Sequence, residues 1–114
     1  MKPTKYTKQD TNTIDLGTKT IYKYPTPTKD MDIGKMVIDG RHPTAGFIVE
    51  EECSFVMYIL KGNGKVFAGD DVFSVEQEDV VFVPKNNKFA VDGQMEYITF
   101  DSPAWYPEQA KEIQ

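Results

Sequence analysis

The chain has 114 residues, of which 39% are hydrophobic and 27% charged, so it is long enough to bury one core and is neither disordered nor fibrous by composition. Its net charge of −5 argues against nucleic acid as a main partner. It has no run of 18 apolar residues, and its first twenty residues are polar, so we expect no membrane partner and a cytoplasmic location.

Single copies of three reactive or aromatic residues exclude much chemistry: the chain has one histidine (His42), one cysteine (Cys53) and one tryptophan (Trp105). Zinc and facial-triad iron sites generally need two or more His or Cys ligands. A disulfide needs a second cysteine. The composition therefore predicts neither a metal site of these kinds nor an internal disulfide.

Residues 1–13 have no apolar pattern, and we expect them to be disordered, with a single domain over 14–114. Ile14, Leu16 and Ile21 predict that the first strand begins shortly after this segment.

Short apolar runs separated by turn residues then recur at a spacing typical of an all-β sandwich or barrel. The predicted strands include 37–38, 47–49, 55–61, 65–69, 72–75, 80–83, 89–91 and 95–100. Asn63-Gly64 predicts a tight hairpin between 55–61 and 65–69, and Asp92-Gly93 predicts another turn. Pro103 ends the last strand, and Pro107-Glu108 predicts a short helical tail.

Two of these runs, 55–60 and 80–83, are apolar at every position, which indicates that both faces of the sheet are covered there. One face belongs to the interior. The N-terminal segment, the tail around Trp105 or a second copy of the chain must cover the other. The pattern leads us to expect a homodimer.

Two stretches carry a resemblance to a known family. The first is Tyr58-Ile59-Leu60-Lys61-Gly62, and the second runs from Glu78 through Pro84 to Phe89 and on to Gly93, with fifteen residues between Gly62 and Glu78. In this order and spacing the chain resembles a small single-domain cupin of the RmlC-like kind. The resemblance implies an antiparallel jelly-roll β-barrel, followed here by the short helical tail.

The same resemblance implies where a metal would be held, and the ligands are missing. The glutamate of the first cupin motif falls at Phe55 and the histidine of the second at Phe89. The other two histidines fall at Val49 and Glu51, or at Ile48 and Glu50. His42 precedes Pro43 in a turn upstream of this strand. We therefore expect a metal-free barrel with no cofactor.

Strand alternation sends Phe55 and Met57 into the barrel, where Phe89 should face Phe55. The predicted ligand pocket also includes Tyr97 and one carboxylate. This carboxylate is Glu51, or Glu50 if the motif is aligned one residue earlier. Lys88 and Arg41 are further candidates near the barrel mouth. The alternative is that these side chains simply fill the barrel as core.

The cupin resemblance and the predicted pocket leave three alternative functions. The first is a metal-free cupin that binds a small molecule in the barrel. The second is an isomerase- or epimerase-like enzyme, for which Tyr97 with Glu51 would be the acid/base pair. The third is a dimeric structural module with a filled core. Cys53 adjoins three glutamates, so we expect a raised thiol pKa and an inert, buried side chain.

Overall fold

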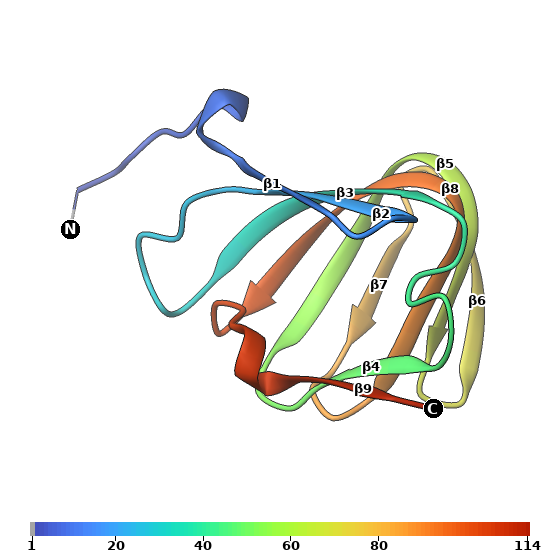
Figure 1. Cartoon of the computed structure of the whole chain (residues 1–114). Coiled ribbons are helices and arrows are strands. Elements are labelled where there is room, and N and C mark those ends of the chain that lie inside the picture. Colours follow the sequence, from blue (N-terminus) through green and yellow to red (C-terminus); the bar gives the residue numbers. More distant parts are fainter. Residues whose placement is uncertain (1) are drawn as a thin grey trace.

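The computed structural model describes residues 2–114 and is built almost entirely of β-strands (Figure 1). Two single-turn 3-10 helices, η1 (Lys8–Asp10) and η2 (Pro107–Gln109), are the only helical elements among these residues. The strands are β1 (Asn12–Asp15), β2 (Lys19–Lys23), β3 (Asp32–Asp39), β4 (Phe47–Glu50), β5 (Ser54–Ala68), β6 (Asp71–Glu76), β7 (Val80–Val83), β8 (Lys88–Ser102) and β9 (Ala110–Ile113).

All strand pairs are antiparallel, and the sheet curls around one interior. One path runs β1-β2-β3-β8-β4-β9, while β5 pairs with β6, β7 and β8 (Figure 1). The predicted all-β, jelly-roll class is therefore confirmed. No helix within residues 2–114 is long and apolar enough to cross a membrane.

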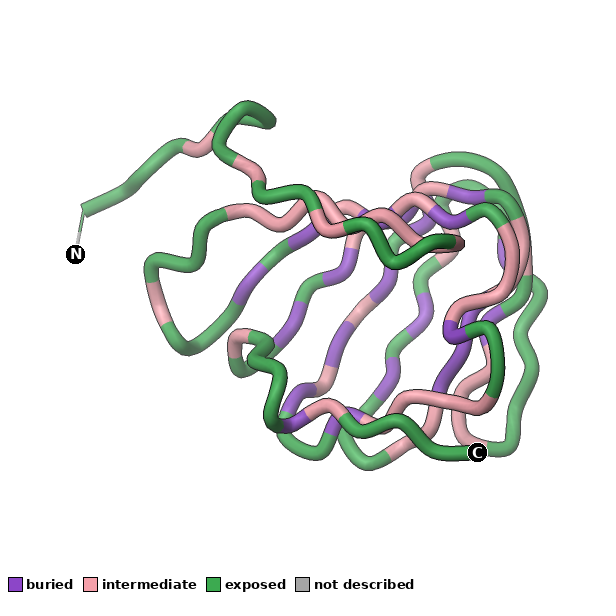
Figure 2. Tube along the Cα trace, in the orientation of Figure 1, coloured by how far each residue is buried: buried purple, intermediate pink, exposed green. Residues whose placement is uncertain are grey.

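Strand alternation separates the core from the surface as the sequence predicts. On β5, Phe55, Met57 and Ile59 are buried, whereas Tyr58 between them is 40% exposed. Buried and exposed positions alternate in the same way along β7 and β8 (Figure 2). The inward side chains of the sheet form one hydrophobic core, which continues onto Ile21 of β2.

The predicted hairpin at Asn63-Gly64 and the predicted turn at Asp92-Gly93 are both wrong. β5 and β8 each run through these positions for 15 residues, and Gly64 pairs with Gly93 in the middle of their ladder. A Cβ atom at Gly62 would collide with the Gln94 carbonyl oxygen, so these glycines permit close backbone approach rather than a chain reversal. The hairpin lies later, where Ala68 pairs with Asp71.

The predicted helical tail is also wrong beyond its first turn. Pro107 does begin a helical turn, but this 3-10 turn ends at Gln109, and β9 follows it and pairs with β4. Without β9, one edge of the four-residue strand β4 would be unpaired. Pairing with β9 satisfies the backbone N–H and C=O groups of this edge, which a helical tail would leave without partners.

The chain's two ends do not cover the outer face of the central strands. The β1–β2 hairpin, which begins at Asn12, extends the sheet at the edge of β3, and Trp105 lines the interior. Tyr58, Val80 and Phe82 on the outer face of β5 and β7 remain 40–60% exposed.

We expect Gly62→Ala to destabilise the fold far more than Gly17→Ala. Both glycines have a positive φ, which costs an alanine about 1–2 kcal/mol, but only at Gly62 would the new Cβ meet backbone. Urea unfolding should give a loss of about 1 kcal/mol for Gly17→Ala and more than about 3 kcal/mol for Gly62→Ala. Equal losses of stability in the two variants would contradict the close backbone contact at Gly62.

Candidate functional site: a cavity inside the barrel

The interior of the barrel is only partly filled. A cavity of about 250 Å³ lies against β2, β3, β5 and β8, a little below the range of about 300–1,000 Å³ that ligand pockets usually have. Four of the five predicted pocket residues line it, namely Phe55, Met57, Phe89 and Tyr97. Phe55 and Phe89 meet edge to face with ring centroids 4.8 Å apart, as the cupin resemblance implies.

This aromatic pair does not fit a metal centre. Phe55 and Phe89 stand where the cupin motifs would place two ligands, and neither side chain offers a donor atom. Within residues 2–114 no three His, Cys, Asp or Glu side chains are grouped so as to hold an ion.

The fifth predicted residue, Glu51, lies outside the cavity and is exposed, beyond the end of β4. The carboxylate inside is that of Glu50, the alternative register. Glu50 is 6% exposed, and burial raises its pKa. Lys88 and Arg41 do not line the cavity: both cations lie over the Phe47 ring, at 4.7 and 5.3 Å from its centroid.

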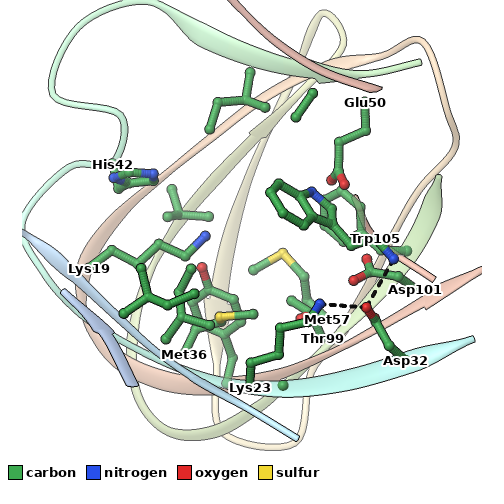
Figure 3. Close-up of a pocket in the computed structure, with 18 of the residues that line it drawn as sticks. Lys19, Lys23, Asp32, Met36, His42, Glu50, Met57, Thr99, Asp101 and Trp105 are labelled. Carbon is green, nitrogen blue, oxygen red and sulfur yellow. Dashed lines mark hydrogen bonds and ion pairs between the residues drawn. The ribbon is translucent and has the colours of Figure 1, made fainter. Parts of the chain in front are cut away.

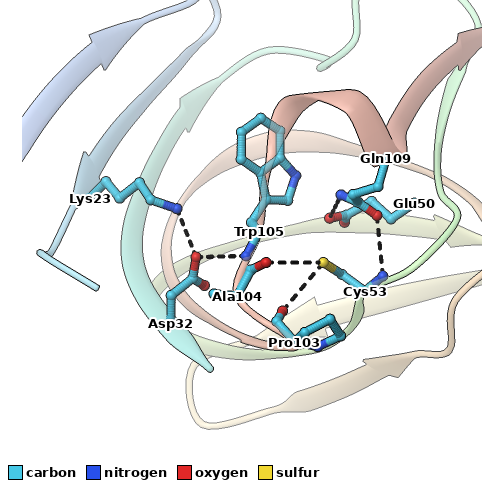
Figure 4. A network of polar contacts seen from close by, with 8 residues as sticks. All are labelled: Lys23, Asp32, Glu50, Cys53, Pro103, Ala104, Trp105 and Gln109. Carbon is cyan, nitrogen blue, oxygen red and sulfur yellow. Dashed lines mark hydrogen bonds and ion pairs between the residues drawn. The ribbon is translucent and has the colours of Figure 1, made fainter. Parts of the chain in front are cut away.

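Gln109 of the C-terminal segment holds Glu50 in place (Figure 4). Its side-chain nitrogen donates to Glu50 at 3.2 Å, and its side-chain oxygen accepts the backbone N–H groups of Glu52 and Cys53 at 3.1 and 3.2 Å. Cys53 itself is fully buried, and its thiol lies 3.3 Å from the Pro103 carbonyl oxygen. Burial and nearby carboxylates raise the pKa of Cys53 to about 12, so the expected buried thiol with a raised pKa is confirmed.

One side of the cavity carries a base and a cation (Figure 3). Lys19, from β2, and His42, from the loop before β4, both line it there. Burial and the positive charge of Lys19 lower the pKa of His42 to about 4, so the imidazole is neutral at pH 7. Burial lowers the pKa of Lys19 to about 8, against the opposing pull of Glu50 and Asp101.

The opposite side is acidic (Figure 3). Asp32 of β3 and Asp101 of β8 are direct cross-strand partners on the inner face. Asp32 Oδ2 accepts from the Lys23 ammonium at 2.7 Å and from the Trp105 backbone N–H at 2.9 Å (Figure 4). Burial, a hydrogen bond with Asp32 and the charges of Glu50 and Asp32 raise the pKa of Asp101 to about 9. At neutral pH the Asp101 carboxyl group is therefore protonated.

Sequence reasoning missed Lys19, Lys23, Asp32 and Asp101. The sequence did contain a signal for them, because residues two or four apart on a strand share a face. Lys19 and Lys23 lie on the same face of β2 as Ile21, and Asp101 lies on the same face of β8 as Tyr97. The structure does not bring the predicted acid/base pair of Tyr97 and Glu51 together, because Glu51 lies outside the cavity. Burial also raises the pKa of Tyr97.

Known proteins resemble this chain in structure and not in sequence. The sequence matches no family model and no curated protein sequence. In structure, the chain is similar to Pac13 from Streptomyces, with a TM-score of 0.90 and 16% identity over 100% of this chain and 93% of that one. It is also similar to an RmlC-like cupin from Shewanella frigidimarina (TM-score 0.70, 22% identity, 84% and 86% covered) and to KdgF from Halomonas sp. (0.73, 14%, 90% and 94%).

These likenesses, at 14–22% identity, show that the chain has the cupin fold. Pac13 is described as a nucleoside dehydratase, and its structures with uridine include variants in which a histidine is replaced with glutamine or a tyrosine with phenylalanine.

We expect Asp101→Asn to flatten the pH dependence of stability. The pKa of Asp101 rises from an ordinary 3.8 to about 9 on folding, so between these values the folded state binds one more proton than the unfolded state. Wild-type stability therefore falls as pH rises through this window, and the asparagine variant lacks this loss. Urea unfolding at pH 5, 7 and 9 should show the variant gaining on the wild type at each step.

The control for this experiment is Asp71→Asn, an exposed carboxylate on β6. It removes a carboxylate from a strand that pairs only with β5, so it should not reproduce the gain expected of Asp101→Asn. A difference between Asp101→Asn and the wild type that stays constant with pH would contradict a protonated Asp101 in the folded protein.

Proposed function

We propose that the chain is a small-molecule-binding cupin whose ligand is neutral and of nucleoside size, held in the barrel cavity without a metal. The observation that supports this most directly is the cavity itself, about 250 Å³ with aromatic and methionine walls and polar groups at two opposite ends. A filled core would leave no such space. The similarity to Pac13 over the whole chain adds support, because Pac13 structures contain uridine.

The methionines of this chain offer a direct test. Met36 and Met57 line the cavity, whereas Met31 lies outside it and is 46% exposed. In a protein with ¹³C-labelled methionine methyl groups, uridine should shift the Met36 and Met57 signals and leave the Met31 signal in place. Absence of any shift at millimolar uridine, and with a panel of other neutral nucleosides and pentoses, would overturn the proposal.

A second candidate function, proton-transfer catalysis of the isomerase or lyase class, is favoured by His42 and Lys19. Because its pKa is lowered to about 4, the His42 imidazole is neutral at physiological pH and one ring nitrogen is free to act as a base. The adjacent Lys19 ammonium would stabilise negative charge that develops on the ligand as the proton leaves. Pac13 catalyses a lyase reaction as a nucleoside dehydratase, which agrees with this chemical class.

We expect His42→Gln to abolish proton abstraction while leaving binding in place. For a ligand found in the methionine assay, deuterium uptake from D₂O into the bound ligand should slow by about 100-fold or more in the variant. The wild-type rate should stay level between about pH 5 and 7. It should fall as pH drops through about 4, where His42 gains its proton, and as pH rises through about 8, where Lys19 loses its proton. Unchanged exchange in the variant would leave a binding protein with no role for His42 as a base.

We also propose that a second copy of the chain covers the outer face of the sheet. Phe82, Val56, Phe100 and Ile33 form one continuous apolar row across β7, β5, β8 and β3. Three of them are 41–60% exposed, and such contiguous patches generally mark interfaces. The N-terminal hairpin and the Trp105 segment lie elsewhere, which leaves a twofold-related copy, whose own row is identical, as the occupant.

Light scattering at micromolar concentration should therefore give about twice the chain mass of 13.0 kDa. Phe82→Glu should give the single-chain mass, because it places a charge in the middle of the buried row. Phe73→Glu is the matched control, since Phe73 is an exposed phenylalanine on β6 outside the row. A monomeric wild type, or dissociation by Phe73→Glu alone, would contradict this interface.

A further inference from the structure

Thr99 is an unsatisfied polar group at the acidic end of the cavity. Its side chain is buried, at 7% residue exposure, and within residues 2–114 its hydroxyl oxygen has no hydrogen-bond partner. The strand register explains why: its neighbours on the inner face are Gly34 of β3 and Met57 of β5, neither of which has a polar side-chain group to offer. A buried hydroxyl left in this state costs about 1–3 kcal/mol, and Thr99 lines the cavity (Figure 3).

The Asp32–Asp101 pair lies next to this hydroxyl. Asp101 is two residues beyond Thr99 on the same face of β8, and Asp32 is two residues before Gly34 on β3. Lys23 and the Trp105 backbone N–H both bind the same oxygen of Asp32, which fixes that carboxylate from two directions. The three polar side chains therefore form a preorganised group on adjoining rows of the sheet.

These groups match the hydrogen-bonding pattern of alcohols. The protonated Asp101 carboxyl group beside the carboxyl oxygens of Asp32 offers both a donor and acceptors, and the Thr99 hydroxyl also donates and accepts. Each hydroxyl group of a ligand needs the same combination. An anionic group such as phosphate would instead meet the carboxyl oxygens of Asp32 and of Glu50, both of which line the cavity and are acceptors.

We infer that Thr99, Asp101 and Asp32 form a subsite for two neighbouring hydroxyl groups of a neutral ligand, a ribose-like vicinal diol. We call these three residues the diol subsite. This inference rests on the proposed small-molecule binding in the same cavity and adds the chemical class of the ligand. It places the hydroxyl groups opposite His42 and Lys19, so the part of the ligand that reacts would lie at the other end.

The test compares uridine with 2′-deoxyuridine and 3′-deoxyuridine on the wild type, on Thr99→Val and on Thr99→Ser, with the Met57 methyl signal as the binding readout. In the wild type, each deoxy analogue should bind about 10-fold or more weakly than uridine. Thr99→Val should weaken uridine binding by a similar factor. Thr99→Ser keeps the hydroxyl and should stay within about 3-fold of the wild type. Inorganic phosphate should not compete with uridine.

Stability separates a ligand-binding role from a structural one. Because the Thr99 hydroxyl has no partner in the unliganded protein, Thr99→Val should unfold at the same or a higher urea concentration than the wild type. A hydroxyl that merely supported the fold would instead give a less stable valine variant.

The possible outcomes keep this inference separate from the proposed function. If uridine binds and both deoxy analogues bind as tightly, the diol subsite is overturned while small-molecule binding stands. If D-ribose binds in a Thr99-dependent way and uridine does not, the diol subsite is supported and the nucleoside-sized ligand is overturned. If uridine, D-ribose and every other neutral nucleoside and pentose of the panel fail to bind, both proposals are overturned.

Discussion

The long antiparallel pairing of β5 with β8 is the constraint on which the rest of the molecule depends. Both strands run for 15 residues through a crossing at Gly64 and Gly93, where the two backbones come too close for side chains. This pairing fixes which residues of β8 face inward, and β3 then pairs with β8 in a matching register. The opposition of Asp32 to Asp101, and of Gly34 to Thr99, follows from that register.

The fold class and the apolar walls of the cavity could be predicted from the sequence, because strand alternation is a local signal. Phe55 and Met57 face inward for this reason, and their partner Phe89 followed from the cupin motifs. The glycine-rich stretches were misread, because Asn-Gly and Asp-Gly satisfy a tight turn and a close strand crossing equally well. Only the pairing partner, far away in sequence, decides between them.

The polar groups of the site could not be predicted for a similar reason. Lys23, Asp32 and Trp105 meet across 82 residues of chain, and each is unremarkable in its own segment. Whether Glu50 or Glu51 faces the interior depends on a shift of one residue in strand register. In the structure Glu50 faces inward and is bound by Gln109, which lies 59 residues further along the chain. Burying these polar groups opposes folding, so the barrel sacrifices some stability to keep both a cationic and an acidic end inside.

The position of Trp105 makes the protein its own optical reporter. It is the only tryptophan of the chain, it lines the cavity while remaining 37% exposed, and the Lys23 ammonium lies 5.4 Å from its ring centroid. Indole emission responds to nearby charge and to water, and all of the signal here comes from one site. Any molecule that enters the barrel and displaces water beside this ring therefore changes the intrinsic fluorescence of the unlabelled protein, so compound libraries can be screened without knowledge of the natural ligand.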